Sequence, residues 1–411
     1  MSFERTAIGV ALALFARCSS ANRRENTDVS ARPMRSLERA SQLSLTQVAD
    51  ASSALAASDE PPLVAPPAAP SGCTLERPVR SINVGEGPLS FATAAAGARS
   101  LLAISTAQTS TLYLSRSDGT LAVLAAPFGP ATALSASGAA HTMVVTWTRS
   151  SASQRATPSI AIVDERDSVR AFAFEERYAP VMTEVLCARV DRAARCAFAL
   201  TERDEFDTNQ GADAARAVLV STTLLPQQSS VEFERRPIVA GVRAAAVVNA
   251  ARPAMTVLRD GGLARTLDDG GLASIDPATL ELAAFGADTA AIELRASAPT
   301  TERCQPAQWA LSLGELGAAR RDSGESTIAT MDARPRGARI RSTGADGTTP
   351  AALWLDAPQC SERLFVIRAH RRGETVALTS ATEFDAASDR ASLSLAWREG
   401  DRLRWARYRC P

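Results

Sequence analysis

An acidic segment near the middle of the chain has the residue types that bind a hard metal ion. Five carboxylates and one amide occur close together: Glu202, Asp204, Glu205, Asp207, Asn209 and Asp213. Carboxylate and amide oxygens are the ligands that Ca²⁺ prefers. Our candidate calcium ligands are Asp204, Asp207, Asn209 and Asp213. Gly211 does not occupy the sixth position that an EF-hand loop requires, so the competing interpretation is an acidic loop exposed to solvent.

The rest of the sequence lacks residues for several catalytic mechanisms. The chain contains no lysine, which excludes lysine-dependent phosphate loops, pyridoxal Schiff bases and kinases. Two histidines, His141 and His370, are too few for a three-histidine metal site. No GxSxG segment occurs, and neighbours such as Glu175 and Glu176 would point to opposite faces of a strand. We therefore assign no catalytic or cofactor-binding residue, and calcium is the single cofactor we consider.

Overall charge argues against a nucleic-acid partner. The 45 basic and 45 acidic residues cancel, so the chain has no net field that attracts a polyanion. The arginines and aromatics of residues 402–409 alternate as on an exposed strand. We expect the partner to be a protein or a glycan.

From residue 79 onward, short β-rich runs alternate with Gly, Asp, Asn and Pro, and no sustained helical stripe appears. Residues 101–106, 111–116 and 120–125 form a predicted meander, with Asp118-Gly119 as one turn. Larger units can be cut near residues 88, 131, 181, 240, 291 and 351. Units of this length suit propeller blades. We predict an all-β protein with a six-bladed β-propeller in residues 73–411, or seven blades, and two β-sandwich domains as the alternative because aromatics make up only 5%.

The N-terminal segment resembles an export signal. Residues 7–16 are apolar and too short to span a bilayer as a helix, and Cys18 follows directly. We expect residues 1–21 to be a lipoprotein-like signal peptide, although Arg17 stands where a lipidation motif has a small residue. Residues 22–72 are predicted to be a disordered Ala/Pro-rich linker. A lipid on Cys18 would be the protein's membrane contact.

This layout resembles uncharacterised exported bacterial proteins with a lipoprotein-like leader, an Ala/Pro linker and a propeller-like β domain. The resemblance covers residues 1–411 as an arrangement of segments, and it implies a periplasmic, outer-membrane-surface or extracellular location.

Six further cysteines are expected to form disulfides. Cys187 and Cys196 would face each other across a hairpin that turns at Asp191-Arg192. That pair leaves three connectivities for the other four cysteines. In a propeller, a Cys73–Cys410 bridge would close the ring, and Cys304 would then pair with Cys360.

The sequence leaves two candidate functions open. The first is a noncatalytic exported or envelope-tethered protein that binds an unidentified ligand or acts as a scaffold. The alternative is a propeller-class enzyme, a glycan hydrolase or lyase, with carboxylates and arginines converging in the central channel. Their convergence in one deep pocket would favour the enzyme.

Overall fold

Tight turns at Gly and Asp separate the strands, as their spacing in the sequence predicts. Residues Ser36–Pro411 form one compact unit. The computed structural model describes residues 36–38, 40–43, 57–58, 68–149, 157–174, 178–182, 184–202, 216–226, 228, 230–240, 243–248, 253–259, 262–266, 272–275, 279–285, 288–296, 309–315, 326–331, 335, 337–356 and 365–411. Within these ranges there are strands and no helix, so no helical segment able to cross a bilayer occurs there.

The described strands form seven antiparallel sheets. The first contains β6 (Leu89–Ala96), β7 (Arg99–Thr106), β8 (Ser110–Ser115) and β9 (Leu121–Ala125). The second contains β10 (Ala131–Ala139), β11 (Thr142–Arg149), β12 (Pro158–Val163) and β13 (Val169–Phe174). The third contains β14 (Tyr178–Met182), β15 (Leu186–Val190), β16 (Ala193–Glu202), β17 (Arg216–Leu224) and β18 (Phe233–Ala240).

The remaining sheets repeat the same meander. The fourth contains β19 (Arg243–Val248), β20 (Pro253–Arg259), β21 (Gly262–Thr266) and β22 (Leu272–Ile275). The fifth contains β23 (Thr279–Phe285), β24 (Asp288–Ala296), β25 (Trp309–Glu315) and β26 (Ser326–Met331). The sixth contains β27 (Ala338–Thr343), β28 (Thr349–Asp356), β29 (Val366–Arg371) and β30 (Glu374–Ser380). The seventh contains β31 (Glu383–Asp389), β32 (Ser392–Glu399), β33 (Arg402–Arg409) and β5 (Arg80–Asn83).

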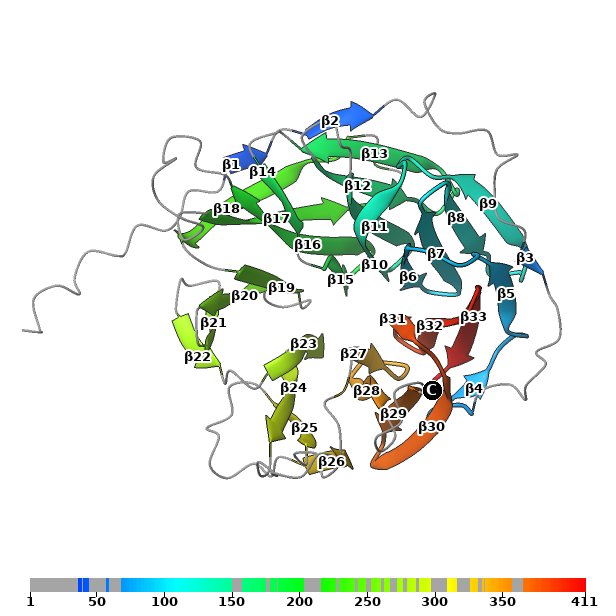
Figure 1. Ribbon diagram of the computed structural model, residues 1–411. Helices are drawn as coiled ribbons and strands as arrows, with labels where there is room; N and C mark the ends of the chain where they lie inside the picture. Colours follow the sequence, from blue (N-terminus) through cyan, green and yellow to red (C-terminus); the bar gives the residue numbers. More distant parts are fainter. Residues whose placement is uncertain are drawn as a thin grey trace, which may run out of the picture. The chain divides into compact units, whose positions relative to one another are not determined.

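Neighbouring sheets meet through their innermost strands. Contacts run from β6 to β10, β15, β19, β23, β27 and β31, and β31 returns to β6 (Figure 1). A closed series of four-stranded meanders is a β-propeller. The all-β propeller prediction is therefore confirmed, with seven sheets among the described residues, and the two-sandwich alternative is wrong because the sheets do not form two stacked pairs.

The seventh sheet is completed by the N-terminal side of the chain. Strand β5 pairs antiparallel with β33, and the short β4 (Thr74–Leu75) pairs with the end of β33. Cys73 and Cys410 form a disulfide at this junction, and Cys187 and Cys196 form a second one across the β15–β16 hairpin. Two of the three predicted bridges are thus present in the structure. Asp191 has a φ of 52°, in the left-handed conformation that such a two-residue hairpin turn requires.

Small residues allow the inner strands to approach closely. Alanines 92, 94, 95 and 96 of β6 are buried. A Cβ on Gly138 of β10 would lie 2.4 Å from the Ala95 carbonyl oxygen, so only glycine fits there. Large aromatics lie one strand further out: Trp147, Trp354 and Trp397 are fully buried on β11, β28 and β32. A low aromatic content is thus compatible with a propeller, because alanine fills the crowded inner layer.

Three short strands lie within the segment that we expected to be a linker. Strand β1 (Ser36–Glu38) pairs with β18, and β2 (Ala40–Leu43) pairs with β13. Strand β3 (Ala57–Ser58) pairs with β5. These strands supply backbone partners to the outer edges of three sheets, which would otherwise expose unpaired N–H and C=O groups.

Candidate functional site

A cavity of about 850 Å³ lies where the innermost strands meet. Its described walls come from β6, β10, β15, β27 and β31, together with the turns that follow β15, β27 and β31. The size suits a small-molecule ligand. The fold thus places one strand from each of five sheets around a common space.

Charged side chains of both signs line this cavity. The carboxylates are Glu184, Asp191, Asp346, Glu383, Asp385 and Asp389. The arginines are Arg189, Arg339, Arg341 and Arg390. They come from strands that are distant in sequence, so their convergence depends on the propeller topology.

Arg339 holds three of the inner strands together. Its Nε donates to Asp385 Oδ1 at 3.1 Å, and a terminal nitrogen lies 2.9 Å from Glu184 Oε1, immediately before β15. The other oxygen of Asp385 accepts the backbone N–H of Thr93 on β6 at 2.8 Å. These groups therefore stabilise the junctions between sheets, and Asp385 and Glu184 are already engaged within the protein.

Asp389 is a buried residue in the same cavity, only 8% exposed. Its Oδ2 accepts the Gly97 N–H at 2.7 Å. Burial raises the pKa of Asp389 above its ordinary value, and the Gly97 hydrogen bond and the charges of Arg189, Arg390 and His141 oppose this shift. A carboxyl with a raised pKa in a cavity is a recognised feature of functional sites.

The raised pKa predicts how stability depends on pH. The folded state holds the Asp389 proton more tightly than the unfolded state, so this group's stabilising contribution is lost as pH rises from 3.8 through the folded pKa. Asp389→Asn does not titrate and keeps an oxygen for the Gly97 N–H. We expect the free energy of unfolding of the variant, minus that of the native protein, to increase as the pH is raised from 4 to 7. Urea denaturation at each pH measures this difference. A constant difference across this range would contradict the prediction.

Asp346 provides a matched control because its pKa shift has the opposite sign. This exposed carboxyl has a lowered pKa because it accepts hydrogen bonds from the side chain and backbone of Thr348. Its stabilising contribution is therefore present above the unfolded pKa and lost as pH falls. Asp346→Asn should lose stability relative to the native protein at neutral pH and match it in acid.

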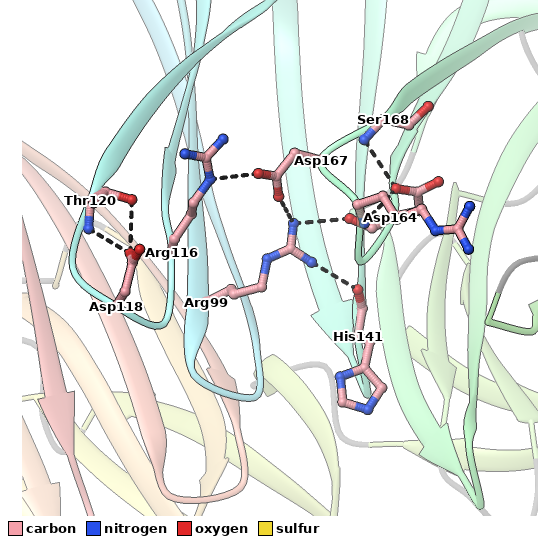
Figure 2. Close-up of polar contacts among 9 residues, drawn as sticks. Arg99, Arg116, Asp118, Thr120, His141, Asp164, Asp167 and Ser168 are labelled. Atoms are coloured by element: carbon pink, nitrogen blue, oxygen red, sulfur yellow. Dashed lines mark hydrogen bonds and ion pairs between the residues drawn. The ribbon is translucent and has the colours of Figure 1, made fainter.

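A separate polar cluster joins the first two sheets outside the cavity. Figure 2 shows Arg99 and Arg116 pointing at Asp167, in the turn between β12 and β13, with both ion pairs at 2.6 Å. Arg99 also donates to the carbonyls of Asp164 and His141, at 2.9 and 3.2 Å. The residues of this cluster are bonded to one another, which indicates a structural joint between sheets.

The two histidines do not form a catalytic arrangement in the described part of the chain. The imidazole of His141 points away from the Arg99 cluster (Figure 2), which it joins only through its carbonyl. His370, on β29, lies 2.7 Å from Thr375 Oγ1 through Nδ1. Burial lowers the pKa of His370 below its ordinary value, so its ring is neutral at pH 7.

Most site residues proposed from the sequence lie outside the described residues. These are Cys18, Asp204, Asp207, Asn209, Asp213, Cys304 and Cys360. Their calcium-binding, lipidation and disulfide assignments stay predictions. Among the residues that are described, no group of three or more His, Cys, Asp or Glu side chains is arranged to hold a metal ion.

The cavity residues were not identified from the sequence. Arg189, Arg339, Asp385 and Asp389 carry no motif, and each is an ordinary strand residue when read along the chain. A usable signal existed: they all lie on the innermost strand of a unit. Selecting charged residues on those strands would have found them.

No family model matches this chain, and no curated protein matches it. Among solved structures, one from a study of two prolyl endopeptidases aligns with a TM-score of 0.43 at 11% identity, covering 75% of this chain and 45% of that one. The β-propeller domain of Cps50 (Swd1) from Myceliophteria thermophila aligns at 0.40 and 12%, covering 74% and 92%. The β-propeller domain of the Trilobed protease from Pyrococcus furiosus aligns at 0.35 and 10%, covering 72% and 98%.

Proposed function

We propose that this protein is a noncatalytic, exported binding protein whose central cavity holds a small ligand or the end of a glycan. The observation that carries this proposal is the 850 Å³ cavity with a charged lining. Glu184 and Asp385 are tied to Arg339, and Asp389 accepts the Gly97 N–H. Acids engaged in this way position strands and shape a pocket, which suits binding better than turnover.

Export is supported by the disulfides. Disulfides persist in oxidising compartments, and one of these two joins residues 337 apart in sequence. We propose a location in the periplasm, on the outer-membrane surface or outside the cell, with Cys18 as the lipidation site. Intact mass of the mature protein, with and without reductant, tests the leader and the bridges together.

Filling the cavity tests the binding proposal. Ser388 lines the cavity from β31 and is half-buried, so Ser388→Trp would occupy the ligand space. We expect the native protein and Ser388→Ala to bind the same members of a glycan and small-molecule array, and Ser388→Trp to lose that binding at least tenfold. Binding that survives in Ser388→Trp would place recognition elsewhere and contradict the proposal.

The enzyme alternative is supported by one observation, the buried Asp389 with its raised pKa among other cavity carboxylates. A protonated carboxyl can act as a general acid in glycan cleavage. Incubating the array's positive glycans with the protein and measuring new reducing ends or ring double bonds distinguishes the two functions. Product formation that Asp389→Asn abolishes would favour the enzyme over the binding protein.

A further inference from the structure

Two arginines in the cavity wall have no acceptor in the described part of the chain. Arg189 lies on β15 and Arg390 follows β31. The Nε of Arg189 is inaccessible to solvent and has no hydrogen-bond partner. A buried donor without a partner costs about 1 to 3 kcal/mol, so its position requires an explanation.

The other two arginines that line the cavity do have acceptors for their hydrogen bonds. Arg339 is paired with Asp385 and Glu184. Arg341 donates from Nε to the Ala386 carbonyl and from a terminal nitrogen to the Ile340 carbonyl, the latter at 2.9 Å. Unpaired guanidinium groups are therefore confined to the side of the cavity formed by Arg189 and Arg390.

Asp389 forms no ion pair with either of these two arginines in the described contacts. The charges of Arg189 and Arg390 both act on its carboxyl, yet its hydrogen bond is to Gly97 N. A guanidinium is planar and presents donors that match a carboxylate in a bidentate manner. Among the described residues no acceptor pairs with these guanidinium groups, so this side of the cavity presents donors that suit a bound anion.

Local charge disfavours an anion with more than one negative charge. Asp389 and Asp191 both line this part of the cavity. Two aspartates already face the two arginines, so repulsion grows with each negative charge on the ligand, and a single carboxylate meets less of it than a dianion such as phosphate. The cavity volume admits a molecule the size of an acidic sugar.

We propose that the cavity binds a small ligand through a single carboxylate held by Arg189 and Arg390. This inference rests on the proposed binding function and names its ligand class. A monocarboxylate sugar, sodium glucuronate, is the test probe. Glucose is the neutral counterpart, and inorganic phosphate at equal ionic strength is the dianionic counterpart.

Isothermal titration calorimetry with matched variants tests the proposal. Arg189→Gln should weaken glucuronate binding about 10- to 100-fold, because a hydrogen bond to a charged group is lost. Arg189→Lys should be intermediate, since it keeps the charge and loses the planar donors. Arg192→Gln is the control, because Arg192 belongs to the same hairpin, is exposed and does not line the cavity. A cooperative thermal transition of Arg189→Gln should show that the variant is folded, so that its loss of binding reports the lost donors.

The possible outcomes distinguish the carboxylate inference from the broader proposal that the cavity binds a ligand. Preferential binding of glucuronate that Arg189→Gln removes and Arg192→Gln keeps would support the carboxylate site. Equal affinity for glucose and glucuronate, tighter binding of phosphate, or indifference to Arg189→Gln would overturn it. If Ser388→Trp still blocked a neutral glycan in that case, the cavity-binding function would stand and only the carboxylate inference would fail. Absence of any cavity ligand would contradict both.

Discussion

Replacing both Cys73 and Cys410 with alanine should lower the free energy of unfolding by about 5 to 6 kcal/mol. The bridge joins residues 337 apart, and closing so long a loop removes a large share of the unfolded chain's entropy in the chain-entropy model. The bridge also ties the segment that leads into β4 and β5 to the end of β33. Urea denaturation followed by tryptophan fluorescence measures the loss, because Trp397 and Trp405 lie in the sheet that the bridge closes.

The second disulfide provides the control for this expectation. Cys187 and Cys196 are 9 residues apart, and the same model assigns their bridge about 3 kcal/mol. Replacing both with alanine should therefore destabilise the protein about half as much. Equal losses from the two double variants, or a larger loss from the hairpin pair, would show that ring closure does not have the expected role.

Local sequence patterns were sufficient to predict much of the fold. The hairpin from Cys187 to Cys196 has a short turn, so its register follows from counting residues, and the observed pairing places these two cysteines opposite each other. The predicted strands at 101–106, 111–116 and 120–125 correspond to β7, β8 and β9. Alternation and turn residues act over a few positions, which is why sequence inspection detects them.

Seven blades were predicted only as the second option to six, because the inner strand of the seventh sheet is unusually polar. Strand β31 has the sequence EFDAASD, and three acidic residues in seven positions predict a loop. All three carboxylates line the cavity. Asp385 accepts the Thr93 N–H of β6, and Asp389 accepts the Gly97 N–H of the turn that follows β6. Tertiary contacts across sheets stabilise this strand, so single-sequence reasoning merged it with the sixth unit. The residues that make the candidate site are thus the ones that obscured the fold.

Arg371→Met should destabilise the protein by about 3 to 5 kcal/mol. Arg371 is fully buried at the end of β29. Its nitrogens donate to Thr343 Oγ1 at 3.0 Å, to the Ser71 carbonyl at 2.8 Å and to the Pro411 carbonyl at 2.9 Å. Removing one member of such a buried network leaves the other polar groups unsatisfied.

Arg372 is the matched control, since it is adjacent and exposed and donates only to the Pro411 carbonyl among the groups described. Arg372→Met should cost about 1 kcal/mol or less. Arg371 and the Cys73–Cys410 bridge fasten the same two chain segments, so their effects should be less than additive when combined. A triple variant that loses the full sum would show independent roles, whereas a smaller loss in urea denaturation would identify the arginine and the disulfide as one closing device.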